Sequence, residues 1–313
     1  MARPLSSLAV AFLAWLLAGT ALADFRQFEE VPVSPRLEAG VASVAQEAFA
    51  RYPALTPGNL SLTLIRLDGA EGPKRASFAG DTTYHPASVV KLFFLAAAHR
   101  ERAAGRLAFD APLEEALRDM IVDSGNDATS YVVDRVTRTT SGPELEGAEW
   151  EEFVSRRNAP NRWFASMGYD INVNGKTWCE GVYGREKQIL GHSREFRNRV
   201  TSEAIGALLL SIARRDLIDG EAGTQMLALM KRPLPGEGVD DQVAEFGGQA
   251  LPAGSKLWSK AGWTSEVRHD AMIVELPDGS KYVAAILTRG AAADPSIIPF
   301  LSSRLLLLID PGA

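Results

Sequence analysis

The order of strand and helix signals along the 313 residues predicts an α+β fold. Segments with strand character occur over residues 59–79 and again from residue 256 onward, and the pattern between them is largely helical. We therefore expect one antiparallel sheet that is built from both ends of the chain and flanked by helices. The intervening part, about residues 103–215, is expected to form an inserted all-helical subdomain.

One helix and two strands are expected before residue 80. Apolar residues recur at helical spacing over residues 35–52, which predicts a helix. Over residues 59–68 they alternate, as in a strand, and an Asp-Gly pair supplies the turn that ends it. A second strand is expected over residues 74–79.

The middle of the chain is expected to be helical, with one irregular part. Helices are predicted from Ser88 to about Arg102, over residues 110–123 and over residues 127–137. Residues 141–200 are rich in aromatic, arginine and asparagine residues without a clear period. Because loops of this length are uncommon unless they are functional, we expect one large excursion over a site. Helices are predicted again over residues 201–215 and 222–230.

The C-terminal part carries three expected strands and a closing helix. The strands are predicted over residues 256–260, 267–276 and 282–288. An Asp-Gly pair lies between the last two, which favours a hairpin. The apolar run over residues 299–309 predicts the final helix.

Residues 1–23 have the pattern of a secretory signal peptide. Arg3 precedes an apolar run over residues 5–17, and Ala21-Leu22-Ala23 matches a small-residue cleavage site. The apolar run is shorter than the ~20 residues that a membrane-spanning helix needs. We expect cleavage after Ala23, a secreted or periplasmic protein, and no membrane association of the mature chain.

Composition narrows the classes of partner. The formal net charge of −6 argues against nucleic acid, which requires basic patches. Cys179 is the single cysteine, so no internal disulfide can form; it is expected to be a small buried residue, with a reactive thiol as the alternative. The four histidines show no paired metal-ligand spacing. We expect a monomer that acts on a small molecule and uses neither a metal nor another cofactor.

Ser88 and Lys91 are the most informative pair in the chain. They form the pattern S-x-x-K at the start of an apolar helical run, and residues three apart lie on one helix face. A serine hydroxyl needs a base beside it to become a nucleophile, and burial favours the neutral, basic form of a lysine. Such a pair also occurs by chance, and a serine at a helix start is often only a cap.

Two further motifs follow in the sequence. Ser124, Gly125 and Asn126 lie between two predicted helices, where they could simply cap the second one. Lys260-Ala261-Gly262 lies on a predicted strand and is uninformative alone. In this order, and on helix, loop and strand, the three motifs resemble the S-x-x-K, S-D-N and K-T-G motifs of the class A β-lactamase and penicillin-binding-protein superfamily. The resemblance covers nearly all of residues 24–313.

The resemblance implies a β-lactamase-like fold and an acyl-enzyme mechanism. Ser88 would attack a carbonyl carbon, and Lys91 would take or relay its proton. Ser124, with help from Lys260, would pass a proton to the departing nitrogen, and Asn126 would hold both the substrate amide and Lys91. The backbone N–H groups of Ser88 and Trp263 would bind the oxyanion, and Gly262 matches the motif glycine.

The motifs depart from the family pattern at three places. Gly125 replaces a carboxylate that braces the loop. Ala261 replaces a hydroxyl that binds a substrate carboxylate, so that role would pass to Thr264, Ser265 or Arg268.

The third departure concerns the deacylating water. The E-x-x-L-N signature that positions this water is absent from residues 141–200. Glu186 is the best stand-in for its glutamate, with Glu180 and Glu195 as rivals, although acidic residues are more often simply solvated.

Three functions remain open on this reasoning. The first is a β-lactamase that acts on a β-lactam or related amide. The second is a peptidoglycan D,D-peptidase or an esterase-like relative that hydrolyses lactams poorly. The third is a non-catalytic binding protein on the same fold, which would not need Ser88, Lys91, Ser124 and Lys260 together.

Overall fold

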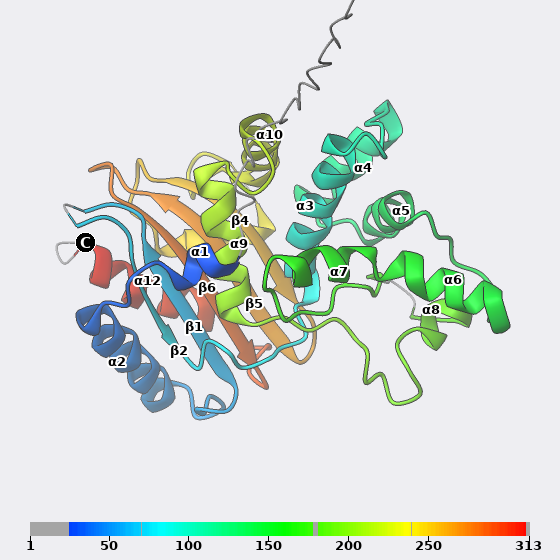
Figure 1. The fold of residues 1–313 in the computed structure, drawn as a ribbon. Helices are drawn as coiled ribbons and strands as arrows, with labels where there is room; N and C mark the ends of the chain where they lie inside the picture. Colours follow the sequence, from blue (N-terminus) through cyan, green and yellow to red (C-terminus); the bar gives the residue numbers. More distant parts are fainter. Residues whose placement is uncertain (1–24, 70, 178–180, 239, 311–313) are drawn as a thin grey trace, which may run out of the picture.

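A computed structural model describes residues 25–69, 71–177, 181–238 and 240–310. Six strands form one antiparallel sheet in the order β2-β1-β6-β5-β4-β3. The strands are β1 (Leu60–Arg66), β2 (Lys74–Phe78), β3 (Lys231–Arg232), β4 (Lys256–Trp263), β5 (Val267–Glu275) and β6 (Lys281–Arg289). Both ends of the chain contribute to the sheet, which confirms the predicted α+β fold (Figure 1).

The junction between early and late strands lies inside the sheet. β1 pairs with β6 over its whole length, for example Leu62 with Ile286. Almost every residue of β1 is buried, because helices cover both faces of the sheet at this point. The buried core around β1 therefore depends on a strand from the C-terminal third of the chain.

Helices cover the two faces of the sheet in separate layers. On one face, α2 (Pro35–Arg51) and α12 (Ile297–Ile309) pack on each other and on the strands (Figure 1). On the other face lie α1 (Phe25–Glu29), α9 (Ser202–Arg214) and α10 (Gly220–Met230). α9 packs on β1, β5 and β6, so the predicted helical insertion of residues 103–215 ends before this helix.

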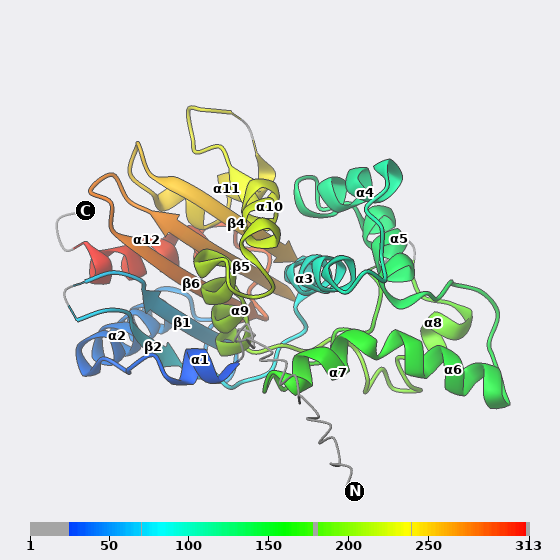
Figure 2. The same cartoon turned by 45° about the horizontal axis from the view of Figure 1, so that its top comes forward.

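The inserted helices lie beside the sheet rather than on it. They are α3 (Val90–Ala103), α4 (Ala111–Ile121), α5 (Asn126–Thr137), α6 (Gly147–Arg157), α7 (Ala159–Ser166) and α8 (Gly184–Gln188). α3 is buried from Val90 to His99 and lies between the sheet and the other helices (Figure 2). The short 3-10 helix η1 (Ala87–Val89) leads directly into α3 and packs against β4 and β5. One apolar core runs from the sheet through α3 into α4 and α5.

Residues 141–200 contain more regular structure than the sequence predicted. α6, α7 and α8 were not expected, because they carry no continuous apolar stripe. In α6 only Phe153 and Arg157 are buried, and α8 is five residues long. Four other short elements were also missed: α1, β3, α11 (Asp241–Ala244) and η2 (Gly247–Ala250).

Some expectations fall on residues that the structure does not describe. The signal peptide, Cys179 and Glu180 lie outside the described residues. Among the helices that are described, none combines the length and the apolar character needed to cross a membrane.

Candidate active site

Ser88 lies in the tight turn that leads into α3. Ala87, directly before it, has a φ of +46°, a conformation that is uncommon for a residue with a Cβ atom. The backbone N–H of Val89 donates to the carbonyl of Pro86 at 3.1 Å, which closes the turn. Strained backbone of this kind persists only where the surrounding structure holds it, and it occurs most often at functional sites.

Gly262 allows β4 to pass directly against this turn. A Cβ atom at position 262 would lie 2.8 Å from the backbone nitrogens of both Ser88 and Val89, and 3.0 Å from the carbonyl oxygen of Pro86. Only glycine fits, because those neighbours are backbone atoms that cannot move aside. This close approach brings the backbone around Trp263 to the Ser88 turn, as a shared oxyanion site requires.

The Lys91 amine joins the helix motif to the loop motif. Its Nζ donates to the carbonyl of Ser124 at 2.6 Å, to the Ser124 hydroxyl at 3.1 Å and to Oδ1 of Asn126 at 3.0 Å. The Lys91 side chain, on α3, is fully buried. Ser124 has a φ of +59°, which turns its hydroxyl and carbonyl toward the amine just before α5 begins.

Lys260 reaches the same hydroxyl from β4. Its Nζ donates to Ser124 Oγ at 3.0 Å, to the Ala261 carbonyl at 2.8 Å and to Oε1 of Gln242. Burial, followed by the charges of Lys91 and Arg232, lowers the pKa of Lys260 well below its usual value. With both lysine nitrogens donating to the Ser124 oxygen, the Ser124 O–H is directed to a third group.

Arg232 and Gln242 brace the loop that carries Ser124, and no sequence motif pointed to either residue. Arg232 Nη2 donates to the carbonyl of Ile121 at 2.6 Å, and Gln242 Nε2 donates to the carbonyl of Val122 at 2.7 Å. These carbonyls end α4, immediately before the loop. The side chains of β3 and α11 therefore support this loop in a chain that has Gly125 at the carboxylate position.

A cleft of about 380 Å³ opens beside Ser88. Asn126, Trp263 and Thr264 also line it, so the structure brings these predicted substrate-binding residues together with Ser88. The turn after β4 forms one wall, and residues from the 141–200 excursion form another. The expectation that this excursion lies over a site agrees with this arrangement.

Glu186 is placed differently from the prediction. Its carboxylate forms a two-point ion pair with Arg157, at 2.6 and 2.7 Å, and accepts from Ser141 at 3.1 Å. Burial alone raises the pKa of the Glu186 carboxyl, but Arg157 and Lys176 outweigh it, so the pKa lies below its usual value. Glu186 is 1% exposed and does not line the cleft. We therefore correct its assignment from deacylation base to structural ion pair.

Glu195, a rival for that role, is also bound elsewhere. Its Oε2 accepts from the backbone N–H of Ser193 at 2.8 Å, within the same turn. It is not among the residues that line the cleft.

Arg268 is likewise not in the substrate cleft. Its guanidinium donates to Glu245 at 2.5 Å and lies over the Phe246 ring, 4.6 Å from the centroid. The next residue, His269, donates from Nε2 to the carbonyl of His85, a residue of the cleft wall. Because successive side chains on a strand point to opposite faces, Arg268 points away from the cleft. Thr264 and Ser265, which line the cleft, remain available for its predicted role.

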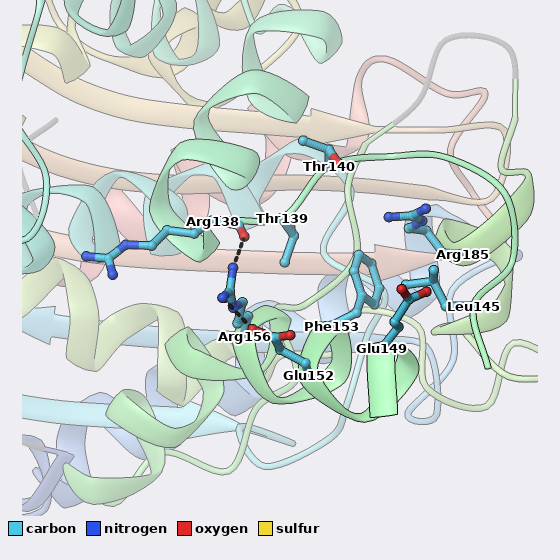
Figure 3. A pocket seen from close by; sticks show the side chains of 9 residues that line it. All are labelled: Arg138, Thr139, Thr140, Leu145, Glu149, Glu152, Phe153, Arg156 and Arg185. Carbon is cyan, nitrogen blue, oxygen red and sulfur yellow. Dashed lines mark hydrogen bonds and ion pairs between the residues drawn. The ribbon is translucent and has the colours of Figure 1, made fainter. Parts of the chain in front are cut away.

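A second hollow lies between α6 and α8, away from these residues (Figure 3). Arg156 spans part of it, donating to the carbonyl of Arg138 at 3.2 Å and pairing with Glu152. The remaining lining residues are Thr139, Thr140, Leu145, Glu149, Phe153 and Arg185. No predicted site residue lies there.

The sheet, the inserted helices and the cleft between them define a β-lactamase fold. The chain belongs to the Beta-lactamase enzyme family, whose sequence model matches residues 108–305. This match includes Ser124, Asn126 and Lys260, and it begins after Ser88 and Lys91.

Solved structures share the fold at low sequence identity. A mutant of PBP-A, as an acyl-enzyme complex with penicillin G, is 20% identical, with 88% of this chain and 97% of PBP-A covered and a TM-score of 0.62. A β-lactamase from Sphaerobacter thermophilus is 20% identical, with 88% and 98% covered and a TM-score of 0.64. A class A β-lactamase representative from Bacteroides cellulosilyticus is 15% identical, with 88% and 99% covered and a TM-score of 0.61. A search of curated proteins found no match.

Proposed function

We propose that this protein is an exported active-site-serine hydrolase that forms an acyl-enzyme with a β-lactam or a related amide. One observation carries the proposal: the Ser124 hydroxyl is held between two buried amines, Lys91 and Lys260, next to the cleft that contains Ser88. This arrangement provides a nucleophile, a base and a proton donor. Export rests on the signal-like residues 1–23, and we propose a monomer.

The proposed acylation step moves one proton from the nucleophile to the leaving group. The Ser88 oxygen bonds to the carbonyl carbon while its proton passes to Lys91, one helical turn away. The developing oxyanion takes hydrogen bonds from the backbone N–H groups of Ser88 and Trp263. The C–N bond then breaks, and Ser124 protonates the nitrogen while Lys91 passes the proton taken from Ser88 to the Ser124 oxygen.

In this proposed cycle, we expect deacylation to be the slow step. A water that attacks the acyl-enzyme needs a general base within hydrogen-bond reach. Among the described residues that line the cleft, Glu266 alone carries a carboxylate, and Glu186 is held in its ion pair. This favours slow turnover, as in the D,D-peptidase or penicillin-binding alternative, over efficient lactam hydrolysis.

We expect an acyl-enzyme to accumulate. On mixing with benzylpenicillin, intact-mass spectra should show a single adduct that decays slowly, and pre-steady-state hydrolysis should show a burst. An adduct that clears within milliseconds would contradict slow deacylation and favour an efficient β-lactamase. If no adduct forms with lactams or with activated esters, the non-catalytic binding protein is the better assignment.

Substitution by arginine should separate the two lysines. Lys91→Arg should stop acylation, because a guanidinium cannot act as a base. Lys260→Arg should keep measurable acylation, since at this position we propose a hydrogen-bond donor to Ser124 rather than a base. The measurement is the rate of adduct formation with benzylpenicillin. Equal loss in both variants would contradict this division of roles.

A further inference from the structure

Two arginine side chains on the cleft wall have no acidic partner among the residues that the structure describes. Arg194 and Arg197 both line the cleft and both are exposed. Over the part of the chain that the structure describes, neither forms an ion pair, whereas nearby Arg199 pairs with Asp170 at 2.7 Å. An unpaired guanidinium in a cleft can bind a carboxylate through charge-assisted hydrogen bonds.

The other charged groups of the cleft do not cancel these two. Lys176 is bound to Asp134 at 2.7 Å, and it also lies 3.6 Å from Glu186. Glu266 supplies one negative charge against the two arginines. The described residues of this wall thus carry a net positive charge, on a chain whose formal net charge is −6.

The turn that carries the arginines is anchored on both sides. The Asn198 side chain exchanges two hydrogen bonds of 2.8 Å with the backbone of Gly175. The Asn172 amide donates to the carbonyl of Arg197 at 3.2 Å, and the Arg197 N–H donates to the carbonyl of Arg194 at 3.1 Å. A site whose backbone is fixed in advance loses less freedom on binding.

The position of the arginines identifies the part of the substrate that they would meet. In the proposed mechanism, Ser124 and Lys260 serve the departing nitrogen, and neither lines the cavity. The cavity instead extends from Ser88 past Asn126 to the wall of residues 175–198. Thr264 and Ser265, proposed for the substrate carboxylate, belong to the other wall, the turn after β4. Because Asn126 is proposed to hold the substrate's side-chain amide, the group that meets the wall of residues 175–198 is the side chain on the acyl side of the scissile bond.

We propose that Arg194 and Arg197 select acyl donors that carry a carboxylate on the acyl side chain. The inference rests on the proposed function and adds a substrate class to it. Benzylpenicillin and carbenicillin make a matched pair of probes, because carbenicillin adds one carboxylate to the same acyl side chain.

The test compares the second-order acylation constants of the two penicillins. We expect the carbenicillin-to-benzylpenicillin ratio to fall about tenfold in the double variant Arg194→Ala/Arg197→Ala, in keeping with loss of hydrogen bonds to a charged group. Glu266→Gln should raise the ratio, and added salt should lower it in the unmodified protein. The control Arg199→Ala removes an arginine outside the cleft and should leave the ratio unchanged.

A binding measurement keeps this inference separate from the catalytic proposal. In a Ser88→Ala background, calorimetry should show tighter binding of carbenicillin than of benzylpenicillin, and the difference should vanish when both arginines are replaced. Failure of either penicillin to acylate Ser88 would overturn the catalytic proposal alone. An unchanged preference in the arginine variants, by rate and by calorimetry, would overturn the assignment of Arg194 and Arg197.

Discussion

Ser88→Ala should abolish covalent labelling by β-lactam and fluorophosphonate probes. Among the residues that the structure describes, only Ser88 combines the start of a buried helix, a lysine three positions later and a place on the cleft wall. Removing its oxygen removes the nucleophile, so no adduct can form whatever the rest of the site does. Intact-mass spectrometry and labelling in a gel both report this directly.

The matched control is Ser265→Ala. Ser265 lines the same cleft but lies in the turn after β4, with no adjacent lysine. This variant should still be labelled at its serine in position 88, as peptide mapping would show. Full-strength labelling of Ser88→Ala would instead assign the nucleophile to another residue.

Glu186→Gln should destabilise the protein by about 3–5 kcal/mol, the usual range when one partner of a buried ion pair is removed. Arg157 is fully buried and would keep its charge, and Lys176 would also lose a nearby negative group. The effect should appear as a lower midpoint of urea unfolding with an unchanged slope. Deacylation by the folded fraction should be unaffected, because Glu186 does not line the cleft.

Helix α6, which carries Arg157, also offers a control ion pair at the protein surface. Arg156 and Glu152 pair four residues apart on α6, with side chains 51% and 62% exposed. Glu152→Gln should therefore change the stability by about 0–1 kcal/mol. If Glu186→Gln were equally mild and slowed deacylation, Glu186 would return as a candidate base.

Local patterns predicted the regular parts of this fold well. β1, β5 and β6 carry strand patterns that the sheet reproduces, and α2 and α12 follow their apolar stripes closely. Helices without such a stripe were missed, since periodicity detects a helix only through the face that it buries. In α6 the buried residues are Phe153 and Arg157. From the sequence alone, an arginine is expected at the surface, so a buried one is not recognised.

The candidate site likewise has residues that the sequence motifs indicate and contacts that only the structure shows. Ser88, Lys91, Ser124, Asn126 and Lys260 stand in short motifs whose order and spacing are visible in the sequence. The structure adds that the amines of Lys91 and Lys260 share one hydroxyl, although the two lysines are far apart in the chain.

The sequence by itself determined the fold class, the order of the three motifs and the residues proposed for acylation. These features depend on local spacing, which a linear chain displays directly. Only the tertiary structure decided that Glu186 pairs with Arg157 and that Arg268 points away from the cleft. Those outcomes depend on which side chains meet across distant segments. An acidic or basic residue looks the same in a sequence whether it meets solvent, substrate or a buried partner.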